Sequence, residues 1–278
     1  ITDGNYKSSI ATWPFLIKKN TITYAFSLQT LSLKKQVNSD KKFTGLFITH
    51  QNNNKPLKAV QDEADAIKKR LTGKFVFNDK VNTQTFNTAF EESTVLHIGT
   101  HAYLSGKNQQ PTLSFDKEQL FLFELGAQKQ APALVVLSAC RTADGLLANG
   151  EGIISLSRGF NALGAPATIA GLWNVNDVAA SVITSNLYQH LLDGESGGEA
   201  LHQAKLDWLN QTQSSDALYL PYYWDSLIYM GSDQQIELKS ATNWWWIIGI
   251  GTGLSIICSA YFILNKPKKK KLSTQQIL

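Results

Sequence analysis

The sequence predicts an α/β fold in which a mostly parallel sheet is flanked by helices. The strongest indication is the run at residues 133–140, which reads ALVVLSAC. A short, continuous apolar run is typical of a strand buried on both faces, as in a parallel sheet. Similar runs alternate along the chain with amphipathic stretches, which predicts βαβ units. With 278 residues, 43% of them hydrophobic, the chain is long enough for one large α/β domain or two small ones.

The spacing of apolar residues predicts the elements in order. Strands are expected at residues 43–49, 74–77, 94–99, 133–139, 166–172 and 227–230. Helices are expected at residues 57–71, 83–91, 150–163, 176–192 and 198–209. Thr83 and Asn176 are residue types that cap helix starts. Two β-like runs at 15–17 and 21–26 predict a hairpin near the N-terminus. Polar loops are expected at residues 34–42 and 105–118.

Composition excludes several classes of function. The net charge is +4, but five lysines within 266–271 exceed it, so the remainder carries −1 and shows no basic excess for nucleic acid. The two cysteines, Cys140 and Cys258, stand in different parts of the chain, and no Cys/His cluster has zinc spacing. We therefore expect no metal or cofactor. Because the only methionine is Met230 and no secretory pattern begins the chain, we expect a piece of a longer polypeptide.

Residues 244–264, from Trp244 to Leu264, contain no charge and begin with three tryptophans. At about 1.5 Å per residue, a helix of this length spans the roughly 30 Å hydrocarbon layer, and tryptophans suit its interface. The lysines that follow predict a cytoplasmic tail. The rest of the chain would then lie on the opposite side, which in a bacterium is the periplasm. A tail-anchored protein with a cytoplasmic domain is the competing arrangement.

Two side chains with catalytic potential follow strands that are successive in the predicted sheet. His101 comes after the strand at 94–99, and Cys140 ends the central strand. If these parallel strands are neighbours, about 4.8 Å apart, both side chains emerge at one sheet edge. An imidazole there would take the proton of a thiol whose pKa is ordinarily about 8.5, and the N–H groups of Ala102 and Cys140 would form an oxyanion hole. A buried structural cysteine and an ordinary loop histidine are the alternatives.

Five segments occur in a characteristic order. They read VLHIGTHA, ALVVLSACRTADG, GEGIISLSRGF, LGAPATIAGLWNVND and PYYWDSLIYMG. Together they resemble the CHAT family of caspase-like proteins, over roughly residues 5–232. The resemblance implies the caspase/separase fold, a dyad with His101 as general base and Cys140 as nucleophile, and frequently an upstream TPR array. Caspase-like enzymes usually have Gly after the histidine; Ala102 keeps the N–H but adds a Cβ beside the substrate.

Trp173 and Asp177 follow the next predicted strand, and by the resemblance they wall the substrate pocket, with Asp177 facing a basic side chain. A packing tryptophan and a helix-capping aspartate are the alternatives. Glu151 and Arg158 are interpreted as structural, and residues 221–224 as an aromatic cover over the sheet. The remaining histidines are also interpreted as structural; they are His50, His97, His190 and His202.

These observations predict a CHAT caspase-like peptidase domain at 1–232, a linker at 233–243, a transmembrane helix at 244–264 and a basic cytoplasmic tail at 265–278. The expected function is a membrane-anchored cysteine endopeptidase that hydrolyses protein or peptide substrates and is regulated by an upstream TPR region. A catalytically weak or inactive CHAT scaffold for signalling or assembly at a membrane is the alternative that Ala102 favours. A nucleotide-binding domain is opposed because the Gly-rich stretches at 150–152 and 249–253 do not form a phosphate loop.

Overall fold

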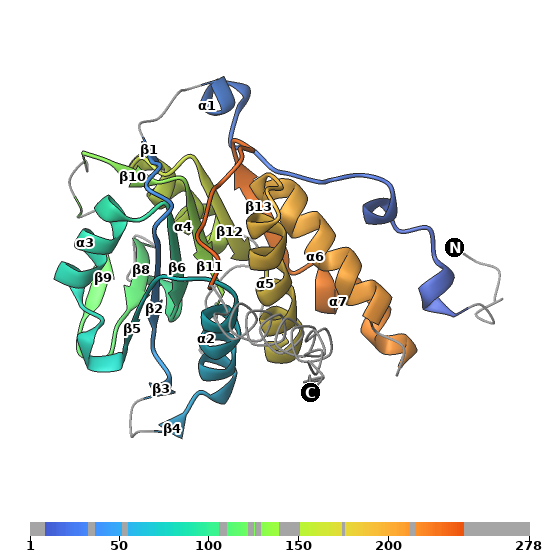
Figure 1. Ribbon diagram of the computed structural model, residues 1–278, viewed down its shortest axis with the longest axis horizontal. Helices are drawn as coiled ribbons and strands as arrows, with labels where there is room; N and C mark the ends of the chain where they lie inside the picture. The colour runs from blue at the N-terminus through green and yellow to red at the C-terminus, as the bar shows by residue number, and fades with distance from the viewer. Residues whose placement is uncertain are drawn as a thin grey trace, which may run out of the picture. The chain divides into compact units, whose positions relative to one another are not determined.

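A six-stranded sheet forms the centre of the computed structural model, in the order β13-β12-β11-β6-β2-β5 (Figure 1). Its strands are Leu227–Gly231 (β13), Ala167–Gly171 (β12), Leu134–Leu137 (β11), Val95–Gly99 (β6), Phe43–Phe47 (β2) and Lys74–Phe77 (β5). Neighbouring strands are parallel except for β12 and β13, which are antiparallel. This sheet confirms the predicted α/β class, and each of its strands overlaps a predicted one.

The structure describes residues 9–32, 37–51, 55–105, 110–121, 125, 129–138, 151–173, 176–211 and 215–241, with the backbone alone at 32, 51, 55, 101–105, 110, 111, 151–155 and 177. These ranges belong to the first of two units, which divide after Ala241. No helix within them is long and apolar enough to cross a membrane. The predicted transmembrane helix at 244–264 and the tail at 265–278 lie outside the described residues.

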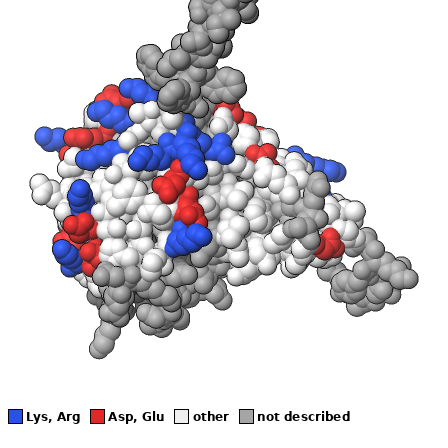
Figure 2. Space-filling model, turned by 60° about the horizontal axis from the view of Figure 1, so that its bottom comes forward, with Lys and Arg blue, Asp and Glu red and all other residues white. Residues whose placement is uncertain are grey.

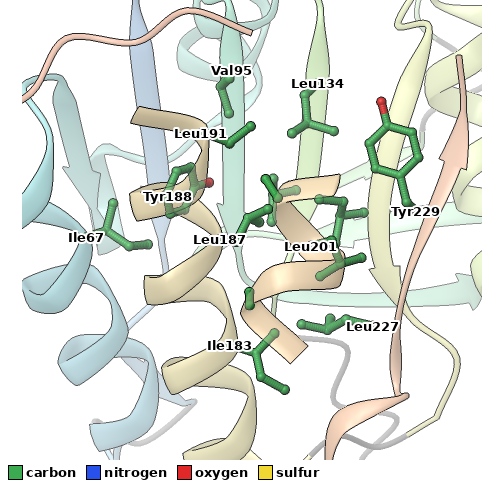
Figure 3. Packing of buried hydrophobic residues seen from close by; sticks show 14 of the residues in the cluster. Ile67, Val95, Leu134, Ile183, Leu187, Tyr188, Leu191, Leu201, Leu227 and Tyr229 are labelled. Carbon is green, nitrogen blue, oxygen red and sulfur yellow. The ribbon is translucent and has the colours of Figure 1, made fainter. Parts of the chain in front are cut away.

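Helices cover both faces of the sheet, because alternate strand residues point to opposite sides. On one face, which we call the α2/α5 face, lie Lys58–Arg70 (α2), Asp177–Leu192 (α5) and Gly197–Gln211 (α6). On the other, the α3/α4 face, lie Thr83–Glu92 (α3) and Glu151–Ala162 (α4). Val95 and Leu134 pack on the first face with Ile183 and Leu187 of α5 (Figure 3). Leu96 and Val135 pack on the second face.

Helix α2 shows why these segments are helical. Its buried residues, Glu63, Ala64 and Ile67, recur at the helical period. Its outward residues include both signs of charge; they are Lys58, Asp62, Asp65, Lys68 and Lys69. Figure 2 shows positive and negative side chains lying next to one another on the face that it presents.

The predicted cap of α5 is confirmed, and that of α3 is shifted by one residue. Asn176 accepts the N–H of Ala179 at 3.1 Å. For α3 the cap is Asn82, whose side chain accepts the N–H of Thr85 at 2.8 Å, and Thr83 is already the first helical residue. Asn is a cap at least as good as Thr, so the local chemistry favours the earlier start.

The prediction of a polar loop at 105–118 is wrong. His101–Ser105 (β7), Gln110–Ser114 (β8) and Gln119–Phe121 (β9) form an antiparallel sheet. Leu113 and Leu120 face each other across this sheet and are buried on the α3/α4 face. Only alternate residues need to be apolar in such a strand, so its polar residues concealed it.

The predicted N-terminal hairpin is also wrong. Residues 9–32, here called the N-terminal arm, contain the 3-10 turns Ile10–Thr12 and Leu16–Lys18 and the helix Leu28–Ser32 (α1). Tyr24 pairs with β13 instead: its N–H donates to Tyr229 and its carbonyl accepts from Gly231, both at 2.8 Å. The second β-like run therefore pairs with the domain at Tyr24, while the first overlaps the 3-10 turn Leu16–Lys18.

Short elements complete the described fold. Val37–Asn38 (β1) pairs with Ala131–Pro132 (β10), and His50–Gln51 (β3) pairs with Lys55–Pro56 (β4). Strand β1 lies within the segment 34–42, where a polar loop was predicted. The remaining helices are the 3-10 turns Asn78–Lys80 and Asp216–Tyr219 and the short helix Pro221–Trp224 (α7).

Candidate active site

Strands β6 and β11 lie next to each other and point the same way. Their register pairs His97 with Val136 and Ile98 with Leu137, and the Ser138 N–H donates to the Ile98 carbonyl at 3.3 Å. Strand β12 continues the parallel array on the other side of β11. The carboxyl ends of the three strands therefore share one edge of the sheet, where parallel sheets commonly bind ligands. The condition stated for the dyad, that the strands before His101 and Cys140 are neighbours, is therefore met.

The chain leaves β6 at Thr100 and enters β7 at His101. Thr100 is buried, and its hydroxyl donates to the Ser114 carbonyl of β8. In the β7–β8 pair, His101 stands opposite Ser114 and Ala102 opposite Leu113. Strand pairing thus holds the backbone of both residues directly beyond the end of β6. Their side chains, and all of Cys140, lie outside the described part of the chain.

Trp173 follows the end of β12 at the same sheet edge. Its indole N–H donates to the carbonyl of Tyr222, in α7, at 3.1 Å. Tyr222 is half-exposed, whereas Trp224 at the other end of α7 is buried in the core. Helix α7 therefore supplies both a buried anchor and an exposed ring, as an aromatic cover would. Asp177 is the first residue of α5, and its side chain is not described.

An ion pair between a buried lysine and a partly exposed aspartate holds α7 to the neighbouring helix. The ammonium of Lys205, on α6, lies 2.8 Å from a carboxylate oxygen of Asp225, the residue that ends α7. Burial lowers the pKa of Lys205, and the charge of Asp225 opposes this shift. The pair thus fixes the turn whose carbonyl accepts the Trp173 hydrogen bond.

Four polar side chains form a buried chain below this sheet edge, and we call them the polar chain. The hydroxyl of Ser138, just after β11, donates to a carboxylate oxygen of Glu63 at 2.7 Å and lies 3.0 Å from His97 Nε2. His97 Nδ1 lies 2.9 Å from the hydroxyl of Tyr188 on α5. Glu63 is 4% exposed, Ser138 7%, and His97 and Tyr188 are fully buried. Polar groups buried this deeply need partners, and each of the four finds one within the chain.

Tyr188 keeps its proton in this setting. Burial, and after it the nearby Glu63 carboxylate, raise the pKa of Tyr188 well above its ordinary value. Figure 3 shows its hydroxyl among the apolar side chains of the α2/α5 face. The tyrosine therefore acts as a hydrogen-bond donor.

The sequence analysis did not predict the polar chain, although one of its residues stands out in the sequence. Glu63 stands with Val60, Ala64 and Ile67 at the spacing of one helix face, and it is the charged residue among apolar ones. The interpretation of His97 as structural is consistent with its burial, but its hydrogen-bond partners, Ser138 and Tyr188, lie just after β11 and on α5.

The other residues interpreted as structural also have partners, where they are described. His50 lies 3.0 Å from Asp116, His190 lies 2.9 Å from Asp207, and the ring of His202 lies 2.7 Å from the Ile17 carbonyl. The Arg158 guanidinium stacks over the Phe26 ring of the N-terminal arm, and the Glu151 side chain is not described. Within the described ranges, no group of three or more His, Cys, Asp or Glu residues could hold a metal ion.

Comparison with known proteins places this arrangement in context. Tetratricopeptide repeat protein 28 of Mus musculus and that of Homo sapiens are 32% and 31% identical to this chain over 108 residues. The match covers 39% of this chain and 4% of either relative, so the chain spans only a small part of their length. Among solved structures, the Saccharomyces cerevisiae separase–securin complex at 3.0 Å matches with a TM-score of 0.51 and 16% identity, over 79% of this chain and 14% of that one.

The likeness to separase confirms the expected fold of the caspase/separase kind. A family model described as "CHAT domain" matches residues 7–232, close to the range that the five segments indicate. The order of those segments, the parallel β6–β11 pair and this match lead to one conclusion: the chain belongs to the CHAT domain family.

Proposed function

We propose that this chain is a cysteine endopeptidase in which His101 is the general base and Cys140 the nucleophile. The observation that supports this most directly is the pairing of β6 with β11. Two parallel strands that are hydrogen-bonded neighbours end side by side, and the two residues follow these ends by two and three positions. This shared edge supports the proposal, because residues that closely follow the ends of neighbouring parallel strands can meet there.

The chemistry follows from ordinary acid–base properties. His101 removes the thiol proton of Cys140, and the thiolate attacks the carbonyl carbon of the scissile peptide bond. The backbone N–H groups of Ala102 and Cys140 stabilise the oxyanion that forms. The imidazolium then gives its proton to the leaving amine, and the C–N bond breaks to leave a thioester. Water, deprotonated by His101, hydrolyses that thioester and restores the thiol.

The substrate pocket is proposed to include Trp173 and Asp177. The hydrogen bond between Trp173 and α7 supports the first, since it fixes the indole at the backbone carbonyl of Tyr222. The start of α5 at Asp177 supports the second. A carboxylate there gives a basic substrate side chain a charge-assisted contact of roughly 1.5–3 kcal/mol. Asp177→Asn should therefore weaken cleavage after Lys or Arg about tenfold to a hundredfold, and a wild type without basic preference would contradict this.

Two further parts of the proposal concern the setting of the domain. An upstream TPR region regulates it, an idea that the names of the curated relatives support. Residues 244–264 cross a membrane once, with the lysine-rich tail in the cytoplasm, as their length, lack of charge and flanking residues indicate. Protease added to intact spheroplasts should then digest the domain and spare the tail; the opposite pattern would place the domain in the cytoplasm.

The decisive experiment is a peptide-library cleavage profile of the purified chain. Cys140→Ala and His101→Ala should each abolish cleavage while the thermal transition stays near that of wild type. Cys258→Ala is the matched control and should cleave normally. Undiminished cleavage by Cys140→Ala would overturn the proposal. A folded wild type that cleaves no peptide, and whose Cys140 reacts with iodoacetamide no faster than Cys258, would favour the scaffold alternative.

A further inference from the structure

The hydrogen bonds of the polar chain allow one consistent direction. The single proton of the Ser138 hydroxyl goes to Glu63, so the contact between Ser138 and His97 requires a proton on His97 Nε2. The Tyr188 hydroxyl retains its proton and donates it to Nδ1. These bonds assign a proton to Nε2 of His97, with donation running from Tyr188 through His97 and Ser138 to Glu63.

The rings around His97 hold it in this orientation. Phe47 stacks on the imidazole at 4.9 Å between centroids, and the Tyr188 ring lies 5.9 Å away. Gly99 makes room for the stacking, because a Cβ at that position would lie 2.6 Å from Phe47. The imidazole is therefore constrained both at its nitrogens and on its flat face.

Stability alone does not explain this arrangement. The second carboxylate oxygen of Glu63 is buried without a hydrogen-bond partner among the described atoms. Burying a charged group that is incompletely satisfied is costly, and apolar side chains of similar size often serve a core equally well. Apolar side chains such as Val136 and Ile67 fill the positions beside the polar chain.

The place of the polar chain in the sequence suggests its role. His97 is four residues before His101, and Ser138 is two residues before Cys140. We propose that the polar chain is a positioning device, which fixes the ends of β6 and β11 relative to each other and so sets the distance between His101 and Cys140. The inference takes its catalytic meaning from the proposed function. Glu63, His97, Ser138 and Tyr188 are accordingly positioning residues that do not touch the substrate.

The test measures how reactive the Cys140 thiol is, which does not require a peptide substrate. The full chain is alkylated with iodoacetamide over a range of pH, and the adduct on the Cys140 peptide is quantified by mass spectrometry. In wild type, a well-placed His101 should put the midpoint of the pH profile below the ordinary thiol value of about 8.5. Ser138→Ala should raise the midpoint by roughly one pH unit, which lowers the rate at neutral pH about tenfold.

Three variants make the result specific. Thr168→Val removes another buried hydroxyl of the same sheet, one without a described partner, and should leave the midpoint unchanged. Glu63→Gln keeps an oxygen acceptor for Ser138 and should retain a midpoint close to that of wild type. Tyr188→Phe keeps the shape of the core and should shift the midpoint in the same direction as Ser138→Ala, so it serves if Ser138→Ala does not fold.

The outcomes separate this inference from the proposed function. The inference is overturned if a well-folded Ser138→Ala keeps the wild-type midpoint. It is also overturned if Thr168→Val or Glu63→Gln shifts the midpoint as far as the inference expects of Ser138→Ala. If wild type cleaves no peptide but Ser138→Ala still shifts the midpoint, the proposed function fails and the positioning role stands. In an active enzyme, Ser138→Ala should lower kcat about tenfold with little change in KM, as expected for a misplaced catalytic pair.

Discussion

The two faces of the central sheet differ in the kind of side chain that they bury. The α3/α4 face is packed by aliphatic and aromatic residues, with the rings of Phe86, Phe90 and Phe160 in mutual contact. The buried titratable side chains of the described residues all lie on the α2/α5 face; they are Glu63, His97, Tyr188, Lys205 and Tyr229. Both faces exclude water equally well. The difference agrees with the positioning role that we propose for the polar chain on the α2/α5 face, whereas the α3/α4 face buries no titratable side chain among the described residues.

The largest expected effect is on the purely apolar face. Phe160 is fully buried, so Phe160→Ala removes a large ring and leaves a cavity. We expect a loss of about 3–5 kcal/mol in the free energy of unfolding, measured by urea denaturation. The alkylation midpoint of Cys140 should not change. A shift of that midpoint would mean that both faces position the candidate dyad.

Removing one donor from the polar chain should cost less. Tyr188→Phe preserves the ring but leaves His97 Nδ1 without its partner, so we expect a loss of about 1–3 kcal/mol. Tyr222→Phe, at a half-exposed tyrosine, is the matched control and should stay within about 0.5 kcal/mol of wild type. Equal stability of the two variants would show that the hydroxyl of Tyr188 contributes nothing.

Replacing the whole polar chain should cost less still, although it changes more atoms. The variant Glu63→Met, His97→Leu, Ser138→Ala and Tyr188→Phe makes this face resemble the other one. Since no polar partner is left unsatisfied, its free energy of unfolding should stay within about 1 kcal/mol of wild type, or exceed it. A cost near the sum of the single variants would mean that the polar chain contributes net stability.

The smallest expected effect is local to the N-terminal arm, whose polar contacts are at the surface. Hydrogen bonds from Thr21, then Gln203, lower the pKa of Glu199 below its ordinary 4.5. Those from Ser9, then Ile10, lower the pKa of Asp216 below 3.8. Because both folded-state values are lowered, these contacts stabilise the arm above the ordinary values and are lost as the pH falls through the lowered ones.

Hydrogen exchange, corrected for the intrinsic rate at each pH, should show this. Amides of the arm should lose protection at acid pH before those of β6 and β11, which lie in the buried sheet. Thr21→Val should lower the protection of the arm at neutral pH and weaken its dependence on pH. Loss of protection in the arm and the sheet at the same pH would remove the distinction between surface and buried polar contacts.

Much of the sheet could be predicted because its strands are short and buried on both faces. Runs such as those around Val95 and Leu134 are recognisable by composition alone. The hairpin near Tyr24 and the loop near Leu113 were mispredicted for the opposite reason. Each of these segments pairs with another strand, β13 for Tyr24 and β9 for Leu113, and the segment's own sequence does not reveal that strand.

The candidate site divides in the same way. The residue types, their order and their positions after predicted strands pointed to His101 and Cys140. The sequence did not indicate that His97 meets Ser138 and Tyr188. A hydrogen bond between side chains separated by 41 residues, as for His97 and Ser138, leaves no periodic trace.

The sequence by itself determined the α/β class, the six strands of the sheet, most of the helices and the membership of the CHAT domain family, because periodicity and ordered motifs are local properties of the chain. The tertiary structure decided that β6 and β11 are neighbours, that the N-terminal arm pairs with β13, and that Glu63 meets Ser138. Those outcomes depend on which distant surfaces bury each other most completely, and that balance exists only in the folded molecule.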